Sequence, residues 1–422
     1  MKSTQIYYDT VSPYYNKYFT RKVPRKIEQQ DEGYQEKFDH HTLFYDTFIS
    51  EGRLIFIGPP LDDKWVLFDF SKVYIDGVKL DKNYQIYRGW KVHRSEFILP
   101  DELLRQVLCK DKVEVSFELG EINYTNTIST RRNELFKNSD VVLAINHNNN
   151  KQWIRDWLTW NISVNGHNGA IIFDNSSTYY SVEKLGDFCK DIPGLDKLMI
   201  VNYPVKFGPI IFNGSGADSD YGQSVMIELA RHKYLSHANT LTHVDLDEYI
   251  YPKISGGRSL VEAVKKDLKG YIDVKGDYVA NVFDDELKFA QDIKTLRAKD
   301  FYYANVNQIF PPFIGMRKYI VDLKRIPRDA QLWIHGVTKI TKPNIGTGSY
   351  HDKISDWFLN HREENYDQII ETSTEFHGAH IRPLTDNWRD NGRDKRYFYD
   401  SNKGTDIELV RFHELLREVF GV

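Results

Sequence analysis

The sequence predicts an α/β fold preceded by a smaller all-β, sandwich-like domain, and three observations support this prediction. Short alternating strands separated by turn residues fill the region from Leu43 to about Ser129. From about Thr130 the pattern changes to continuous apolar strands that alternate with helical stretches. The run 241–250 is typical of a buried strand that ends where three acidic side chains begin. We therefore expect a lead-in (1–35), a β domain (36–135) and an α/β domain with a carboxyl-terminal helical segment (136–422).

Composition excludes several classes of protein. The 422 residues are enough for two or three domains that each bury a core. The net charge of -4 argues against a general nucleic-acid binder, which would be strongly basic. The sequence has no signal-peptide pattern and no uncharged apolar run of about 18 residues, so contact with a membrane could only be peripheral. Cys109 and Cys189 are too few for a disulfide framework, and we interpret both as core thiols of a cytoplasmic protein.

The amino-terminal region is expected to be a polar arm followed by antiparallel strands. Residues 1–35 form an irregular lead-in whose basic patch, 21–26, is either solvated or docks on an anionic surface. The aromatic strands that follow either hold a glycan or only form a core. These strands are expected at Arg53–Ile57, Trp65–Phe70, Val73–Gly77, Gln85–Trp90 and Lys112–Glu118.

A strand, a helix and a second strand open the α/β domain. Val141–Ile145 and Gly169–Phe173 are continuous apolar runs, typical of strands covered on both faces. Between them, Lys151–Trp160 carries tryptophans at helical spacing, which we expect in the core. Ligands of open α/β sheets bind beyond the carboxyl ends of the strands, where Asn146 and Asp174 stand.

Further elements follow in order. A third strand, Lys197–Val201, leads into a glycine-rich loop, Asn213–Asp218, that lacks the lysine and the spacing of a P-loop. Helices are expected over 222–237, 259–268 and 406–420, and a strand over 277–283.

The acidic end of the run 241–250 is the strongest chemical signal. Because strand side chains alternate, Asp245 and Asp247 are expected on one face while Leu246 enters the core. Two close carboxylates are unfavourable unless a cation lies between them, and such ligands suit Mn²⁺ or Mg²⁺ that is also held by phosphates. The pattern therefore favours a metal-diphosphate site with Asp247 as the more direct ligand, although a solvated acidic loop has the same sequence.

A set of short motifs occurs in a fixed order between Val141 and Arg362. They are Ile145-Asn146, Arg155–Leu158, Phe173–Ser177, Gln223, Asp245–Tyr249, Arg317–Val321, His335–Val337 and Asn360–Arg362. In this order they resemble the inverting GT-A glycosyltransferases of the β-galactosyltransferase and galactan synthase family and their bacterial relatives. The family's segment before the lysine-rich strand has no counterpart in 283–315, and its eukaryotic membrane anchor is missing.

The resemblance implies a metal-dependent hexosyltransferase. It would move a sugar, with galactose as the first candidate, from a UDP-sugar to an oligosaccharide or lipid-linked glycan in bacterial surface polysaccharide synthesis, with inversion. The donor-binding residues would be Asn146, Asp174, Asn175, Gln223 and Asp245. The metal, Mn²⁺ or Mg²⁺, would be held by Asp245, Asp247 and His335, with His361 as a further candidate ligand.

Two functional details rest on a few carboxylates. Asp174 can accept a hydrogen bond from a base imide N–H, which uracil has and cytosine lacks. The alternative is that Asp174–Ser177 only caps a turn. The carboxylates that could deprotonate the acceptor hydroxyl are those after the last expected strand, Asp284, Asp285 and Glu286.

Two other functions are compatible with the acidic motif. A haloacid-dehalogenase-type phosphohydrolase also places Asp-x-Asp at a strand end, but it requires Thr or Val where this chain has Tyr249. A non-catalytic glycan-binding protein could use the acids to hold Ca²⁺.

Overall fold

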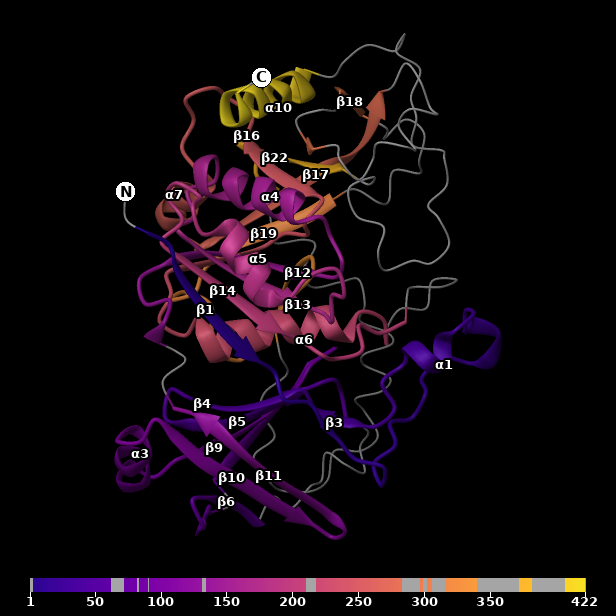
Figure 1. The fold of residues 1–422 in the computed structure, drawn as a ribbon, viewed down its shortest axis with the longest axis vertical. Coiled ribbons are helices and arrows are strands. Elements are labelled where there is room, and N and C mark those ends of the chain that lie inside the picture. The colour runs from indigo at the N-terminus through magenta and orange to yellow at the C-terminus, as the bar shows by residue number, and fades with distance from the viewer. Residues whose placement is uncertain are drawn as a thin grey trace.

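The structure is a computed structural model of the 422-residue chain (Figure 1). The residues it describes are 3–61, 72–81, 83–89, 91–130, 134–209, 218–282, 297–298, 302–305, 316–339, 372–381 and 407–421. In this part of the chain, no helix is long and apolar enough to cross a membrane.

A mixed sheet of ten strands forms the centre of the α/β part of the chain. The strand order is β1-β14-β13-β12-β15-β19-β17-β22-β16, and β18 pairs with β17. Strands β1, β14, β13, β12 and β15 run parallel, whereas β19 is antiparallel to β15 and β17. The bounds are β1 (Gln5–Thr10), β12 (Asp140–Asn146), β13 (Gly169–Asp174), β14 (Lys197–Asn202), β15 (Thr240–His243), β16 (Glu248–Pro252), β17 (Tyr271–Val282), β18 (Tyr302–Asn305), β19 (Met316–Asp322) and β22 (Phe376–Ile381).

Helices cover both faces of this sheet, as the continuous apolar strands predicted. In β12, Val142 and Ala144 pack in the cluster that contains α4, α5 and α7, while Val141, Leu143 and Ile145 pack in the cluster that contains α6. Because both faces are buried, the parallel strands consist of apolar residues without alternation. The helices are α4 (Lys151–Ser163), α5 (Val182–Cys189), α6 (Tyr221–Leu229), which continues as the π-helix η4 (Ala230–Tyr234), and α7 (Leu260–Lys266).

Local sequence explains where these helices begin. The Asn150 side chain accepts a hydrogen bond from the Gln152 amide and caps α4, and Ser259 forms a capping box with Glu262 at α7. The tryptophans of α4 lie in the core as predicted, and Trp157 and Trp160 are fully buried. The last helix, α10 (Ile407–Phe420), is confirmed and packs its apolar face on Trp160 and its neighbours.

Two antiparallel sheets of four strands precede the α/β part and share one apolar cluster. Figure 1 shows them at the opposite end of the molecule from α10. The first consists of β4 (Asp46–Ser50), β5 (Arg53–Gly58), β9 (His93–Ile98) and β8 (Tyr84–Arg88), and the second of β11 (Ile122–Ser129), β10 (Lys112–Leu119), β6 (Val73–Ile75) and β7 (Val78–Lys79). Helix α3 (Asp101–Leu108) was not expected, and the run 65–70 lies outside the described residues.

Short elements complete the description. They are β2 (Tyr14–Tyr15), which pairs with β3 (Thr42–Phe44), the hairpin of β20 (Ala330–Trp333) and β21 (Gly336–Lys339), the 3-10 helix η1 (Ile27–Gln29) and α1 (Tyr34–Lys37).

Three expectations for the amino-terminal region and the cysteines are wrong. Residues 1–35 are not only an irregular lead-in, because β1 pairs in parallel with β14 at the edge of the central sheet. The basic patch is not a fully solvated arm, since Arg21 donates hydrogen bonds to the carbonyls of Pro60 and Thr42 and is buried, although Lys22 and Lys26 are exposed. Cys189 is buried, but Cys109 is exposed beyond the end of α3. The first two differences depend on tertiary partners that lie outside residues 1–35.

A buried ionic network joins the first amino-terminal sheet to α6. The Glu228 carboxylate accepts hydrogen bonds from Arg94 of β9 at 2.8 Å, from Arg231 at 3.3 Å and from the Leu332 amide at 2.8 Å. Burial raises the pKa of Glu228, but Arg231, His232 and Arg94 outweigh burial and lower it to about 2. The carboxylate is therefore charged at neutral pH and holds three segments of the chain together.

We expect the substitution Glu228→Gln to lower the free energy of unfolding by about 3–5 kcal/mol at pH 7, because Arg231 would stay buried without a counter-charge and Arg94 would keep only Glu96, at 2.7 Å. The difference in free energy of unfolding between the variant and the unchanged protein should shrink as the pH falls from about 4.3, the pKa of Glu in the unfolded chain, towards 2. At that pH Glu228 becomes protonated in the folded protein as well. Denaturant unfolding at several pH values measures both effects.

The matched control is Glu102→Gln on α3. Glu102 is 70% exposed and pairs with Arg105 at 2.8 Å, so its loss should change stability by less than about 1 kcal/mol. Equal effects of the two substitutions would contradict a structural role for the Glu228 network.

Candidate functional site

The carboxyl ends of the parallel strands meet at one edge of the central sheet. Asn146 of β12 stands opposite Asp174 of β13, and Asp174 stands opposite Asn202 of β14. The loops that follow β12 and β13 are joined by hydrogen bonds. Asn148 accepts hydrogen bonds through its side-chain oxygen from the Thr178 and Tyr179 amides, at 2.7 and 3.2 Å. The edge thus presents polar loops of defined shape, where ligands of open α/β sheets bind.

Asn146 and Asp174 are brought together as predicted. The Asn146 amide donates to Asp174 Oδ1 at 2.5 Å and to the Tyr180 hydroxyl at 3.1 Å, and the Ser177 amide donates to Asp174 Oδ2 at 3.1 Å. Both side chains are almost fully buried. Asp174 therefore makes the contacts of a turn cap, the alternative stated above, and its recognition of a base stays a prediction.

Asn175 joins the loop after β13 to the segment after β14. Its side-chain amide donates to the carbonyl oxygens of Tyr203 at 2.7 Å and Val205 at 2.8 Å, and the residue is buried. These two bonds tie the end of β13 to the segment that leaves β14. The contacts position the loop, and a direct role of Asn175 at a donor remains a prediction.

The acidic motif lies in a turn rather than at the end of one long strand. Strand β15 ends at His243 and β16 begins at Glu248, so residues 244–247 connect two strands that are not neighbours in the sheet. Leu246 is buried as expected. The strand ends where the acids begin, as expected, but the strand alternation expected to place Asp245 and Asp247 on one face does not apply. The Asp245 amide donates a hydrogen bond to the Glu248 carboxylate at 2.8 Å, which closes the chain into a turn.

Lys318 of β19 is the partner of Asp245. Its ammonium nitrogen has no exposed surface and lies 2.8 Å from Asp245 Oδ2 and 3.0 Å from Glu248 Oε2. Gln223 of α6 donates to the other oxygen of Asp245 at 2.5 Å. Burial lowers the pKa of Lys318, but Asp245 and Glu248 outweigh burial and hold it above its ordinary value. The ammonium therefore stays charged and neutralises part of the acidic motif.

The pKa values of Asp245 and Glu248 are shifted in opposite directions. Burial raises the pKa of Asp245, but Lys318 and His243 outweigh it and keep that pKa well below its usual range. Burial and the neighbouring Asp245 charge raise the pKa of Glu248 above its ordinary value. Asp245 is thus the fixed anion of the pair.

Asp247 turns to a different partner, His380 of β22. The distance from His380 Nε2 to Asp247 Oδ2 is 3.2 Å, and that from His380 Nδ1 to Glu248 Oε1 is 3.6 Å. This pairing exists because β22 adds to β16 with His380 opposite Glu248. We did not predict His380 as a site residue, because its 133-residue separation from Asp247 leaves no local signal.

His335 lies near the same group but does not join it directly. It follows β20, and its Nδ1 is 3.0 Å from the Arg317 carbonyl oxygen. The side chain is exposed, yet surrounding protein and the Lys318 ammonium lower the pKa of His335 to about 4. The neutral imidazole is a state in which histidine can bind a metal. Its role as a ligand remains a prediction.

Asp247 and His380 are the described side chains that would hold a cation if a substrate supplied the remaining ligands. Among the described residues, no group of three or more His, Cys, Asp or Glu side chains has the arrangement of a metal site. Asp247 and His380 converge on each other, however, and Mg²⁺ or Mn²⁺ is often held by one or two protein ligands together with phosphates. Asp245 is already paired with Lys318, which makes Asp247 the better placed carboxylate.

The other candidates cannot be placed in this arrangement. Asp284, Asp285, Glu286 and His361 lie outside the described residues.

Comparisons with known proteins give only partial likenesses. No protein-family model matches the chain, and no curated protein sequence matches it. Three similar solved structures are glycosyltransferases. The bifunctional glycosyltransferase WbbM is 10% identical, with a TM-score of 0.26, over 48% of this chain and 35% of that chain. The galactosyltransferase LgtC, in complex with donor and acceptor sugar analogues, is 12% identical, with a TM-score of 0.24, over 44% of this chain and 58% of that chain. The mannosyltransferase Ktr4p of S. cerevisiae is 12% identical, with a TM-score of 0.26, over 53% of this chain and 64% of that chain. The matched part covers less than two thirds of each of these proteins, and likenesses of this size do not place the chain in a family.

We expect Lys318→Met to lower the melting temperature without metal and to increase the gain in melting temperature caused by Mn²⁺. The reason is that Asp245 and Glu248 would face each other without the ammonium, and a divalent cation could take its place. Thermal unfolding with Mn²⁺ and with EDTA measures this difference.

The control is Lys324→Met, which removes an exposed lysine that donates to Asn239 at 3.1 Å. It should alter neither the melting temperature nor the Mn²⁺ effect. A Lys318→Met protein as stable as the unchanged protein, or one indifferent to Mn²⁺, would contradict this account of the acidic motif.

Proposed function

We propose that the chain is a metal-dependent glycosyltransferase that transfers a hexose from a nucleotide diphosphate sugar to a glycan acceptor. The observation that supports this best is the division of the acidic motif at the carboxyl edge of the sheet. Asp245 is neutralised by the buried Lys318, whereas Asp247 faces an imidazole, His380. One carboxylate is thus fixed by the protein, and the other is paired with a metal-binding side chain.

In this proposal Asp247 and His380 hold Mn²⁺ or Mg²⁺, and Asp245 lies beside them. When bound, the cation supplies a Lewis acid that neutralises charge on the departing nucleoside diphosphate. The protein's own contribution is to hold Asp247 in place, through His380 and through the Asp247 carbonyl, which accepts a hydrogen bond from the Ile381 amide at 2.7 Å. Lys318 and Gln223 orient Asp245.

The donor is proposed to be a UDP-sugar, with UDP-galactose as the first candidate. The uridine part is supported by Asp174, the last residue of β13, whose carboxylate can accept from a base imide N–H in addition to its two present donors. The sugar, the acceptor glycan and inversion at the anomeric carbon rest on the motif resemblance. Asp284, Asp285 and Glu286 stay the candidates for the base that deprotonates the acceptor.

The other two functions have less support. A phosphohydrolase of the Asp-x-Asp type needs a free carboxylate as its nucleophile, but Asp245 is bonded by Lys318 and Gln223. A protein that only binds glycans through Ca²⁺ would need more oxygen ligands, since Ca²⁺ takes about six to eight. The described acidic group pairs with nitrogen donors instead.

We expect Asp247→Ala and His380→Ala each to lower Mn²⁺ affinity in the presence of UDP by at least about tenfold and to abolish or strongly reduce transfer. The matched control is His377→Ala on the same strand, because His377 pairs with Asp277 at 3.1 Å instead. Titration of Mn²⁺ followed by electron paramagnetic resonance measures the affinity.

The same titration on His335→Ala separates the two histidines. A loss confined to His335→Ala would assign the metal shell to that residue, as the motif resemblance implies, and remove His380 from it. Full transfer activity in EDTA would overturn the metal requirement itself.

We expect UDP with Mn²⁺ to raise the melting temperature more than CDP or GDP does. Asp174→Ala should erase the preference for UDP over CDP, and Asp174→Asn should shift it towards CDP, because an amide can donate to the ring nitrogen that cytosine presents. Stabilisation by a panel of nucleotides, followed by turnover of the corresponding nucleotide sugars, provides the measurement. Stronger stabilisation by CDP or GDP would show that the uridine assignment is wrong.

A further inference from the structure

Tyr179 is the most exposed tyrosine in the described part of the chain, with 72% of its surface accessible. It lies in the loop that follows β13, at the edge of the central sheet where the parallel strands end. Among the residues that the structure describes, its side chain makes no hydrogen bond and stacks on no other ring. Single exposed apolar side chains are common on protein surfaces, so the meaning of this ring depends on where it is held.

The backbone of Tyr179 is held by the neighbouring loop. The Asn148 side-chain oxygen accepts hydrogen bonds from the Thr178 amide and hydroxyl, at 2.7 and 3.3 Å, and from the Tyr179 amide at 3.2 Å. In the opposite direction, the Asn148 amide donates to the Ser177 hydroxyl at 2.8 Å. The loops after β12 and β13 therefore support each other, and a fixed backbone carries the accessible Tyr179 ring.

The next residue, Tyr180, shows what an anchoring tyrosine does in the same loop. Its hydroxyl donates to the Asn149 carbonyl at 2.6 Å and accepts from the Asn146 side-chain amide at 3.1 Å. That amide also donates to Asp174 Oδ1 at 2.5 Å. Tyr180 thus connects both loops to the carboxylate that is proposed to read the donor base. The Tyr179 ring takes no part in these bonds and is left available for a ligand.

We propose that the Tyr179 ring stacks on the base of the nucleoside diphosphate donor, an inference that rests on the proposed function. A base is a flat π system, and an accessible aromatic ring can cover one of its faces. Because the bonds to Asn148 already fix the backbone of Tyr179, only its side-chain torsions have to be ordered when the base binds.

The place of the ring along the sheet edge favours a base over another flat or apolar ligand. The proposed cation site, Asp247 and His380, lies beyond β15, and β12 separates β15 from β13. Two strand spacings correspond to about 10 Å. A nucleotide carries its base and its phosphates on opposite sides of the ribose. With its diphosphate at the cation, the donor can therefore place its base beside Asp174 and Tyr179.

Stacking and hydrogen bonding make different contributions in this arrangement. Every base has a π face, so Tyr179 contributes affinity without selecting among bases. Asp174 contributes the choice of uracil, because it accepts from an imide N–H. The two residues can therefore be separated by comparing nucleotides that differ only in the base with a ligand that has no base.

The test measures the affinity of the full-length protein for UDP, CDP and inorganic pyrophosphate, each with Mn²⁺, by calorimetry. Tyr179→Ala should weaken UDP and CDP by the same factor, at least about fivefold, and leave the ratio of their affinities unchanged. The affinity for pyrophosphate, which has no base, should not change. Tyr179→Phe keeps the ring and should bind the nucleotides as the unchanged protein does.

The matched control is Tyr15→Ala, which removes another exposed tyrosine, 62% accessible, on β2. It should alter none of these affinities. Both alanine variants should keep the melting temperature of the unchanged protein, since exposed rings add little to its stability.

A loss of nucleotide affinity in Tyr179→Ala that is absent in Tyr179→Phe supports the proposal. Unchanged UDP affinity in Tyr179→Ala would overturn the stacking role and leave the proposed function intact. An equal loss of pyrophosphate affinity would also overturn that role, because the effect would then not concern the base. If the unchanged protein bound neither nucleotide, this inference and the proposed function would both be wrong, so the two failures can be told apart.

Discussion

Lys318 is an ammonium group without solvent contact that is held between two carboxylates, and the arrangement of the candidate site depends on it. Removing such a charge from water is costly, and the cost is offset only when both partners are in place with good geometry. Lys318 therefore requires Asp245 and Glu248 at 2.8 and 3.0 Å, and they in turn require the turn at 244–247. The charge balance of this group sets which acidic side chain is left without an ammonium partner and is therefore available to the proposed cation.

Asp247 is the acidic side chain that pairs with an imidazole, because of the order in which the strands of the sheet pair. Strand β22 pairs with both β16 and β17, and it brings His380 opposite Glu248. Gly276 and Gly378 allow this pairing, because a Cβ on Gly276 would lie 2.2 Å from the Gly378 carbonyl oxygen. A larger residue at Gly276 would push β22 away, and His380 would move with it. The backbone of one strand pair thus controls the distance between Asp247 and its imidazole.

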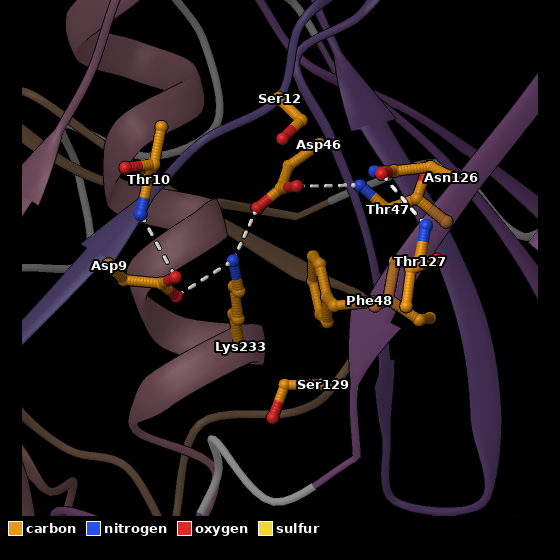
Figure 2. A pocket seen from close by; sticks show the side chains of 11 residues that line it. Asp9, Thr10, Ser12, Asp46, Thr47, Phe48, Asn126, Thr127, Ser129 and Lys233 are labelled. Atoms are coloured by element: carbon orange, nitrogen blue, oxygen red, sulfur yellow. Dashed lines mark hydrogen bonds and ion pairs between the residues drawn. The ribbon is translucent and has the colours of Figure 1, made fainter. Parts of the chain in front are cut away.

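The amino-terminal sheets are attached to the same core by buried charges instead of by apolar contacts alone. Two residues of α6 and η4 make these contacts: Glu228 pairs with Arg94 of β9, and Lys233 pairs with Asp46 of β4. A π-helix widens the backbone spacing, and such segments often occur at functional sites. Here η4 places Lys233 towards the amino-terminal sheets while Arg231 faces the β20 region. A small cavity beside Lys233 and Asp46 lies at this junction (Figure 2).

The sequence by itself determined the α/β character, the helix with Trp157 and Trp160, the 14-residue helix that ends at Phe420 and the grouping of Asn146 with Asp174. These features depend on periodicity and on neighbouring parallel strands, which short-range patterns report. Only the tertiary structure decided that β1 joins the sheet edge, that Arg21 is buried and that Lys318 and His380 divide the acidic motif. The partners in those contacts are separated by up to 192 residues, as in Gln5 and Lys197, and residue spacing carries no information about pairings that arise only when the sheet and its buried charges come together.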